Sequence, residues 1–216
     1  MSKNIDRTDD FLAKCADAAY SNLQARYRFG EKVYDENDIR QYFYLALVRR
    51  RVSEHRIALE CQFSEKYPKR GIDTRIELPT GRVWMEFKFH RERPRYHLSR
   101  TKYLGILLSD FFRLASLRSG RKYSCYIADS AMIRYFSNFN IMELVSGKPF
   151  TVQSKGNDFY LGNTKVRRCS GDLIRKKTWS LAPNAKVRIT PIPLKASNLT
   201  RKPADYPYWL FLYKIG

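Results

Sequence analysis

The first third of the chain carries apolar residues at helical spacing in two segments, which Gly30 separates. Between Thr8 and about Tyr27 the apolar stripe consists of Phe11, Leu12, Cys15, Ala18, Ala19 and Leu23, and this spacing predicts an amphipathic helix. Thr8 is expected to cap it. A second helix is predicted to begin after Asp35 and to extend to about Val52, because Asp35 is a suitable cap and acidic residues follow it in the first turn.

After this helix the apolar period changes from that of a helix to that of a strand. Ile57, Leu59, Cys61 and Phe63 alternate with other residues, which predicts a strand. The sequence Pro79-Thr80-Gly81 predicts a tight turn, so the strands on its two sides should form an antiparallel hairpin. The predicted elements are strands at 56–63, 72–78 and 82–89, a helix at 99–117, a strand at 123–128 and a short helix at 130–136. From residue 35 the order is therefore helix, strand, strand, strand, helix, strand.

Beyond Asn138 the apolar pattern is weaker and is interrupted by Gly, Pro and Asn. Short strands are predicted at 150–153, 159–161, 186–191 and 209–215, and the sequence does not say where they lie. We expect three parts: an N-terminal helix at 1–34 packed on the core, a core at 35–138, and a β-rich basic extension at 139–216 that belongs to the same domain.

The composition and the net charge of the chain indicate what class of partner this predicted α/β protein binds. The chain has 216 residues, of which 44% are hydrophobic, so it can build one sizeable domain. It holds 41 Lys and Arg against 21 Asp and Glu, a net charge of +20. A folded domain with this charge attracts polyanions through counterion release. Nucleic acid is therefore the first partner to consider.

Other classes of protein are disfavoured. No segment approaches the roughly 18 apolar residues of a membrane-spanning helix, and residues 1–10 are too polar for a signal peptide. We expect a soluble, cytoplasmic protein with no membrane partner. Four cysteines stand far apart without a second Cys or a His nearby, so neither a zinc site nor a disulfide framework is indicated. Cys15, Cys61 and Cys125 are predicted to be reduced core residues.

The segment that points to chemistry is the predicted hairpin at 72–89. Asp73 lies near the start of its first strand, while Glu86 and Lys88 lie near the end of the second. Antiparallel pairing brings all three to the same end of the hairpin, and residues two apart in a strand share a face. Mg²⁺ in proteins is held by one or two carboxylates, and a neighbouring Lys can orient a water or neutralise charge on a phosphate. The three residues are predicted to form a catalytic site.

This arrangement resembles the PD-(D/E)XK, or restriction-endonuclease-like, nuclease superfamily. Its signature is an Asp at the start of one hairpin strand and (Asp/Glu)-x-Lys on the next, matched here by Asp73 and, thirteen residues later, by Glu86-Phe87-Lys88. Ile72 stands where the name-giving Pro would be. The resemblance implies an α/β fold with a restriction-endonuclease-like αβββαβ core, a mixed central sheet flanked by helices, and here a C-terminal β-rich extension. It also implies the main-chain carbonyl of Phe87 as a metal ligand.

A third carboxylate is implied by the same resemblance, since members often supply one from the helix before the first strand. Glu36 is the matching candidate for a catalytic and metal-binding residue, and Asp38 is the second. Both can also be explained as first-turn acids that the helix dipole favours. Glu77 is a further alternative, although it lies about 13 Å from Asp73 along the strand.

The individual residues also have simpler explanations. Asp73 could accept backbone hydrogen bonds after a Gly turn, and Glu86 and Lys88 could belong to the solvated face of an edge strand. The functional interpretation is favoured because the residues occur together in one hairpin of a strongly basic chain.

Basic residues directly after Lys88 are expected to contact the phosphates of a nucleic acid. They are His90, Arg91, Arg93, Arg95, Arg100 and Lys102. A second basic cluster, formed by Lys165, Arg167, Arg168, Arg175, Lys176 and Lys177, suggests a clamp on the backbone.

The leading hypothesis is an endonuclease that uses Mg²⁺, with Mn²⁺ able to replace it, to hydrolyse phosphodiester bonds in DNA. The first alternative is a nucleic-acid-binding or assembly subunit that has a nuclease-like fold and does not cleave. The second is an RNA-processing nuclease. A homodimer is possible, because cutting both strands with one site per chain requires two chains or two events.

Overall fold

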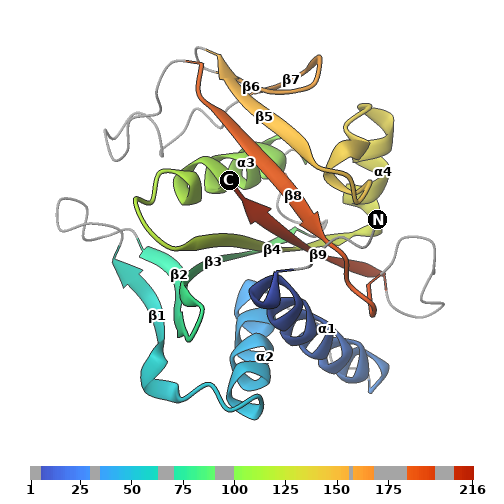
Figure 1. Cartoon of the computed structure of the whole chain (residues 1–216). Coiled ribbons are helices and arrows are strands. Elements are labelled where there is room, and N and C mark those ends of the chain that lie inside the picture. Colours follow the sequence, from blue (N-terminus) through green and yellow to red (C-terminus); the bar gives the residue numbers. More distant parts are fainter. Residues whose placement is uncertain are drawn as a thin grey trace, which may run out of the picture.

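The computed structural model of the chain describes residues 6–29, 35–62, 71–90, 100–155, 158–167, 184–197 and 207–216 (Figure 1). Within these ranges nine strands form a single sheet in the order β1-β2-β3-β4-β9-β8-β5-β6-β7. The strands are β1 (Ile57–Gln62), β2 (Gly71–Leu78), β3 (Gly81–His90), β4 (Arg121–Asp129), β5 (Phe150–Lys155), β6 (Asp158–Leu161), β7 (Thr164–Arg167), β8 (Lys186–Ile192) and β9 (Tyr208–Ile215). The sheet is mixed, since β3 and β4 are parallel and the other neighbouring pairs are antiparallel.

Helices cover both faces of this sheet (Figure 1). They are α1 (Arg7–Arg28), α2 (Glu36–Arg49), α3 (Arg100–Ala115) and α4 (Ser130–Asn138), with short 3-10 helices η1 (Glu54–Arg56) and η2 (Met142–Leu144). Alternation along β3 sends Met85 and Phe87 into an apolar cluster with α1 and α2. Trp84 joins the opposite cluster, which contains the apolar side chains of α3 and α4. The protein is therefore a mixed α/β fold with two cores.

The predicted order of elements from residue 35 to residue 138 is observed, as α2, β1, β2, β3, α3, β4 and α4. Asp35 caps α2 as expected, in a capping box with Asp38. The cap of α1 was predicted wrongly, because the Asp6 carboxylate, and not the Thr8 hydroxyl, accepts from a backbone N–H of the first turn. Thr8 is buried and its hydroxyl lies 2.8 Å from that of Thr80 in the turn between β2 and β3.

The strands after residue 139 continue the same sheet. β9 lies between β4 and β8, and it pairs with β4 from Lys122↔Ile215 to Asp129↔Tyr208. The strand β7 was not predicted from the sequence. Helix α1 packs on α2 and on β9, so the N-terminal helix covers a strand from the C-terminal region. The strands of the core and of the β-rich region belong to one sheet.

The edge pair β1 and β2 meets closely at Gly71. A Cβ atom at this position would lie 2.8 Å from the carbonyl oxygen of Cys61, a contact that rigid backbone does not allow. Gly71 also opens β2 two residues before Asp73.

We therefore expect Gly71→Ala to push β1 and β2 apart and to lower the free energy of unfolding by about 1–3 kcal/mol. Urea denaturation followed by circular dichroism would measure this loss. Gly216→Ala is the matched control, since a Cβ there makes only an ordinary contact, 3.7 Å from the carbonyl oxygen of Arg188. Equal losses in the two variants would contradict the close approach at Gly71.

No helix among the described residues is long and apolar enough to cross a membrane. Cys15, Cys61 and Cys125 are free thiols, of which Cys15 and Cys125 are buried. Cys169 lies outside the described residues.

Candidate active site at the open end of the β2–β3 hairpin

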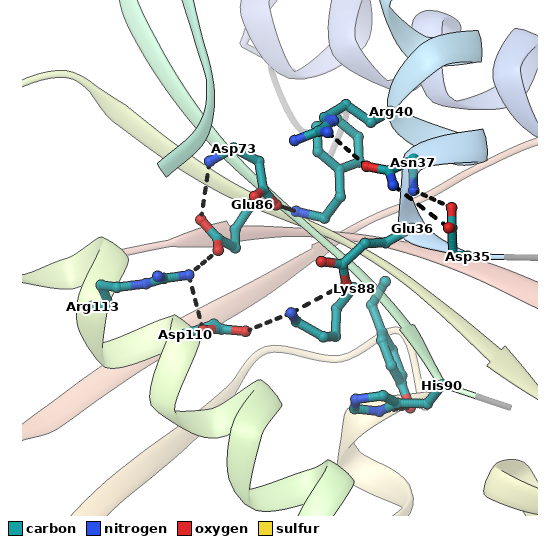
Figure 2. Close-up of polar contacts among 12 residues, drawn as sticks. Asp35, Glu36, Asn37, Arg40, Asp73, Glu86, Lys88, His90, Asp110 and Arg113 are labelled. Atoms are coloured by element: carbon teal, nitrogen blue, oxygen red, sulfur yellow. Dashed lines mark hydrogen bonds and ion pairs between the residues drawn. The ribbon is translucent and has the colours of Figure 1, made fainter. Parts of the chain in front are cut away.

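The backbone ladder between β2 and β3 ends at the pair Thr74↔Met85. One residue further, side chains take over the pairing. The backbone N–H of Phe87 donates to Asp73 Oδ2 at 2.7 Å, and the backbone N–H of Asp73 donates to Glu86 Oε2 at 3.4 Å. The carboxylates of Asp73 and Glu86 are thus held against the backbone of the hairpin where the two strands separate (Figure 2).

Lys88 extends this site toward α2. Its Nζ donates to Glu36 Oε2 at 3.2 Å and lies 3.5 Å from Asp110 Oδ2. Glu36 is in the first turn of α2, which begins directly after the capping residue Asp35. The structure therefore brings together Asp73, Glu86, Lys88 and Glu36, which the sequence analysis selected from three separate elements.

Two further residues, Asp110 and Arg113 of α3, complete the cluster and were missed in the sequence. Arg113 Nη2 forms an ion pair with Glu86 and another, at 3.0 Å, with Asp110 Oδ1. Its Nη1 donates to the carbonyl of Gly71 at 3.3 Å. A polar chain consequently runs from Asp73 through Glu86, Arg113, Asp110 and Lys88 to Glu36 (Figure 2). A signal was present, because Asp110 interrupts the apolar run of α3 with its partner three residues away.

The balance of charge in this cluster is negative. Four carboxylates, from Glu36, Asp73, Glu86 and Asp110, face the two cations of Lys88 and Arg113. Burial raises the pKa of Asp73, and the hydrogen bond from Phe87 offsets this only in part. Burial also raises the pKa of Asp110, against the attraction of Lys88. Burial alone would lower the pKa of Lys88, yet Asp110, Glu36 and Asp73 together hold it above its ordinary value. With all four carboxylates ionised, the cluster has two more negative than positive charges, and burial shifts Asp73 and Asp110 toward their neutral forms.

These carboxylates fit a hard divalent cation in their chemistry. Mg²⁺ takes carboxylate and carbonyl oxygens, and a net negative pocket favours it. Asp110 Oδ2 is buried and accepts no hydrogen bond, so it retains acceptor capacity in this cluster. In the described part of the chain no set of three or more His, Cys, Asp or Glu side chains has its ligand atoms gathered for a metal ion. Here the carboxylates are turned toward Lys88, Arg113 and the Phe87 amide instead.

His90 does not contact phosphates, contrary to the sequence prediction. Its side chain is 2% exposed, its ring lies 4.7 Å from that of Tyr103, and its Nδ1 lies 3.2 Å from the Tyr126 hydroxyl. Burial lowers the pKa of His90 well below its ordinary value, and the neighbouring Lys88 lowers it further. It is a neutral residue of the interior that supports the strand behind Lys88.

The other candidates for the third carboxylate lie elsewhere. Glu77 pairs with Arg82 at 2.7 Å and with Arg75 at 3.5 Å, at the turn end of the hairpin. Asp38 closes the capping box of α2 and pairs with Arg26 at 3.1 Å. Glu36 contacts Lys88 in the cluster, whereas Glu77 and Asp38 pair with arginines outside it.

Most of the residues predicted to contact nucleic acid lie outside the described part of the chain. Residues 91–99, with Arg91, Arg93 and Arg95, lie outside the described residues, as does the side chain of Lys102. Arg100 is exposed at the start of α3. In the second basic cluster, Lys165 pairs with Asp158 at 2.8 Å. The remaining members of that cluster, Arg168, Arg175, Lys176, Lys177 and the side chain of Arg167, are outside the described residues.

Comparisons with protein-family models, with curated proteins and with solved structures find no match to this chain.

Proposed function

We propose that this protein is a metal-dependent endonuclease that hydrolyses phosphodiester bonds in DNA, with a restriction-endonuclease-like core made of α2, β1, β2, β3, α3 and β4. The observation that carries the proposal is the cluster at the open end of the hairpin, where Asp73, Glu86 and Lys88 meet Glu36. A buried excess of carboxylates is costly unless a cation or a function compensates it. Its presence in a chain of net charge +20 supports a site for a cation and a phosphate.

In this proposal Asp73, Glu86 and the main-chain carbonyl of Phe87 hold Mg²⁺, with Glu36 as a further carboxylate. When bound, the ion polarises the scissile phosphate and lowers the pKa of a water. Mn²⁺ is expected to replace it. The attacking water forms a bond to phosphorus while one ester P–O bond breaks, which leaves one phosphate end and one hydroxyl end.

Lys88 has the position to assist that step. Lys88 lies two residues after Glu86, near the end of β3, and its ammonium group contacts Glu36 and Asp110. Its raised pKa keeps it charged. A fixed cation at this place can orient the water or stabilise the negative charge that develops on the phosphate oxygens. Arg113 holds Glu86 and Asp110 in place and so acts as a positioning residue.

The substrate is inferred from charge. The excess of basic residues favours nucleic acid, and we expect DNA before RNA. A homodimer would let two such sites cut both strands.

The test is incubation of the protein with plasmid and linear DNA in Mg²⁺ or Mn²⁺, with a chelator as the blank. We expect cleavage that the chelator abolishes and that Asp73→Ala reduces by more than about 100-fold, since a metal ligand is lost. Glu77→Gln is the matched control on the same strand, because Glu77 lies at the far end with Arg82, and it should cleave normally. Cleavage by Asp73→Ala at the wild-type rate would refute the site, and competition between DNA and RNA substrates would identify the preferred nucleic acid.

A specific observation favours a second candidate, a nucleic-acid-binding subunit that does not cleave. Each carboxylate of the cluster has a partner within the protein: Glu86 has Arg113, Asp110 has Lys88 and Arg113, Asp73 has the Phe87 amide, and Glu36 has Lys88. In this alternative the cluster is purely structural. DNA binding without cleavage of duplex, single-stranded or branched DNA in any metal would support it.

A further inference from the structure

A second pocket lies at the other end of the hairpin, beside the turn that joins β2 and β3. It has a volume of about 330 Å³ and four arginines line it. Arg7 is the first residue of α1, Arg50 and Arg51 follow the end of α2, and Arg56 belongs to η1. This site is separate from the carboxylate cluster, because Glu77 at its rim lies about 13 Å along β2 from Asp73.

The pocket has a large excess of positive charge. Its one acidic lining residue, Glu77, is already paired with Arg82 and Arg75. Arg50 is fixed by two carbonyl groups, those of Ala46 at 3.3 Å and Lys14 at 3.0 Å. Over the described residues, Arg7, Arg51 and Arg56 have no recorded carboxylate partner. Several guanidinium groups around one pocket, without carboxylate partners, are suited to binding a phosphate.

The backbone at Arg51 adds an independent observation. Arg51 has a φ of 64°, in the left-handed region that only a few per cent of residues other than Gly adopt. The N–H of Arg51 bonds the carbonyl of Val48 at 2.8 Å, and the N–H of Val52 bonds that of Leu47 at 3.1 Å. These bonds form a Schellman motif, in which Gly is the preferred residue at the position of Arg51. The left-handed conformation at this position favours Gly, yet the residue present is an arginine whose side chain lines the pocket.

Another part of the wall is apolar. Phe11 of α1, Val52 and Leu78 line the same space as the arginines. A ligand that fits both parts of the wall has a phosphate at one end and a flat, weakly polar body at the other. The volume is within the range of pockets for small organic ligands.

We propose that this pocket binds a nucleoside 5′-phosphate, with the phosphate on the arginines and the nucleoside against Phe11 and Leu78. The ligand is either a free mononucleotide or the 5′-phosphorylated end of a nucleic-acid strand, since both present the same group. The proposal does not depend on hydrolysis at Asp73, because the two sites share no residue.

The test is isothermal titration of the full chain with adenosine 5′-monophosphate, adenosine and inorganic phosphate. We expect the monophosphate to bind, adenosine not to bind, and inorganic phosphate to bind more weakly than the monophosphate. Arg51→Gly is the central variant, because it removes the guanidinium and relieves the backbone at the same position. It should weaken binding of the monophosphate about tenfold while the melting temperature stays equal or rises.

Arg49→Gln is the matched control, since Arg49 is an exposed arginine of α2 that does not line the pocket. It removes the same charge and should leave binding unchanged. A stronger affinity for a 5′-phosphorylated oligonucleotide than for its 5′-hydroxyl form, lost in Arg51→Gly, would assign the strand end. Binding of the mononucleotide, with equal affinity for the 5′-phosphorylated oligonucleotide and its 5′-hydroxyl form, would assign the free nucleotide. Absence of binding, or an equal loss in Arg49→Gln and Arg51→Gly, would overturn the proposal.

Discussion

Replacing Lys88 by Gln is expected to lower the rate of DNA hydrolysis by about 10²–10³-fold while metal binding is retained. The rate falls because a fixed charge that stabilises the developing negative charge on the phosphate is lost. Binding of Mg²⁺ should not weaken, since the substitution removes a cation that lies 3.2 Å from Glu36 and 3.5 Å from Asp110. Single-turnover cleavage and calorimetric titration with Mg²⁺ would measure the two quantities separately.

This split distinguishes the role of Lys88 from that of Asp73. Asp73→Ala should lose both metal binding and cleavage, because Asp73 is proposed as a ligand. Lys122→Gln serves as a control for the loss of one positive charge. Lys122 lies on β4, where its register partner on β3 is Trp84, which is outside the cluster. A Lys88→Gln protein that cleaves as fast as Lys122→Gln would show that Lys88 takes no part in the reaction.

Replacing Arg113 by Ala is expected to lower the free energy of unfolding by about 3–5 kcal/mol. Arg113 binds Glu86 and Asp110, whose side chains are only 4% and 8% exposed. Without the guanidinium, Glu86 loses its ion pair with Arg113, while Asp110 keeps the one with Lys88. An uncompensated buried charge is strongly destabilising. For a chain of this length the loss corresponds to a fall in melting temperature of about 10 °C.

Thermal and urea denaturation would measure the effect of Arg113→Ala. Arg118→Ala is the matched control, because Arg118 is an exposed arginine just after α3, and it should change stability only slightly. Arg113→Lys keeps the charge but loses the fork that spans two carboxylates, so its stability should fall between those of wild type and Arg113→Ala. Equal stability of Arg113→Ala and Arg118→Ala would mean that the ion pairs with Glu86 and Asp110 contribute nothing to the fold.

The sequence predicted local structure well where one period dominated. The alternation from Ile57 and the turn at Pro79-Thr80-Gly81 predicted β1, β2 and β3 to within one or two residues. A tight turn fixes the register of its hairpin, so Asp73 and Glu86 could be expected at the same end. Asp35 was recognisable as a cap because its side chain acts within its own turn.

Errors arose where the environment of a residue depends on distant segments. His90 stands at the start of a basic stretch, which predicted that its side chain is exposed. In the structure it is buried because it packs against Tyr103 of α3 and Tyr126 of β4. Thr8 has the side chain of a cap, yet its hydroxyl meets Thr80, seventy-two residues away. The strand β7 has four residues, too few for alternation to stand out from its surroundings.

The sequence by itself determined the elements from residue 35 to residue 138, the register of the hairpin, and the presence of carboxylates and a lysine at its open end. Local periodicity and turn chemistry suffice for these features. Tertiary structure alone decided that β9 pairs with β4, that α3 contributes Asp110 and Arg113, and that four arginines line one pocket beside the turn. Such neighbours depend on how whole helices and strands bury their apolar faces against one another. They join residues that are too far apart in the sequence for a local pattern to predict their contact.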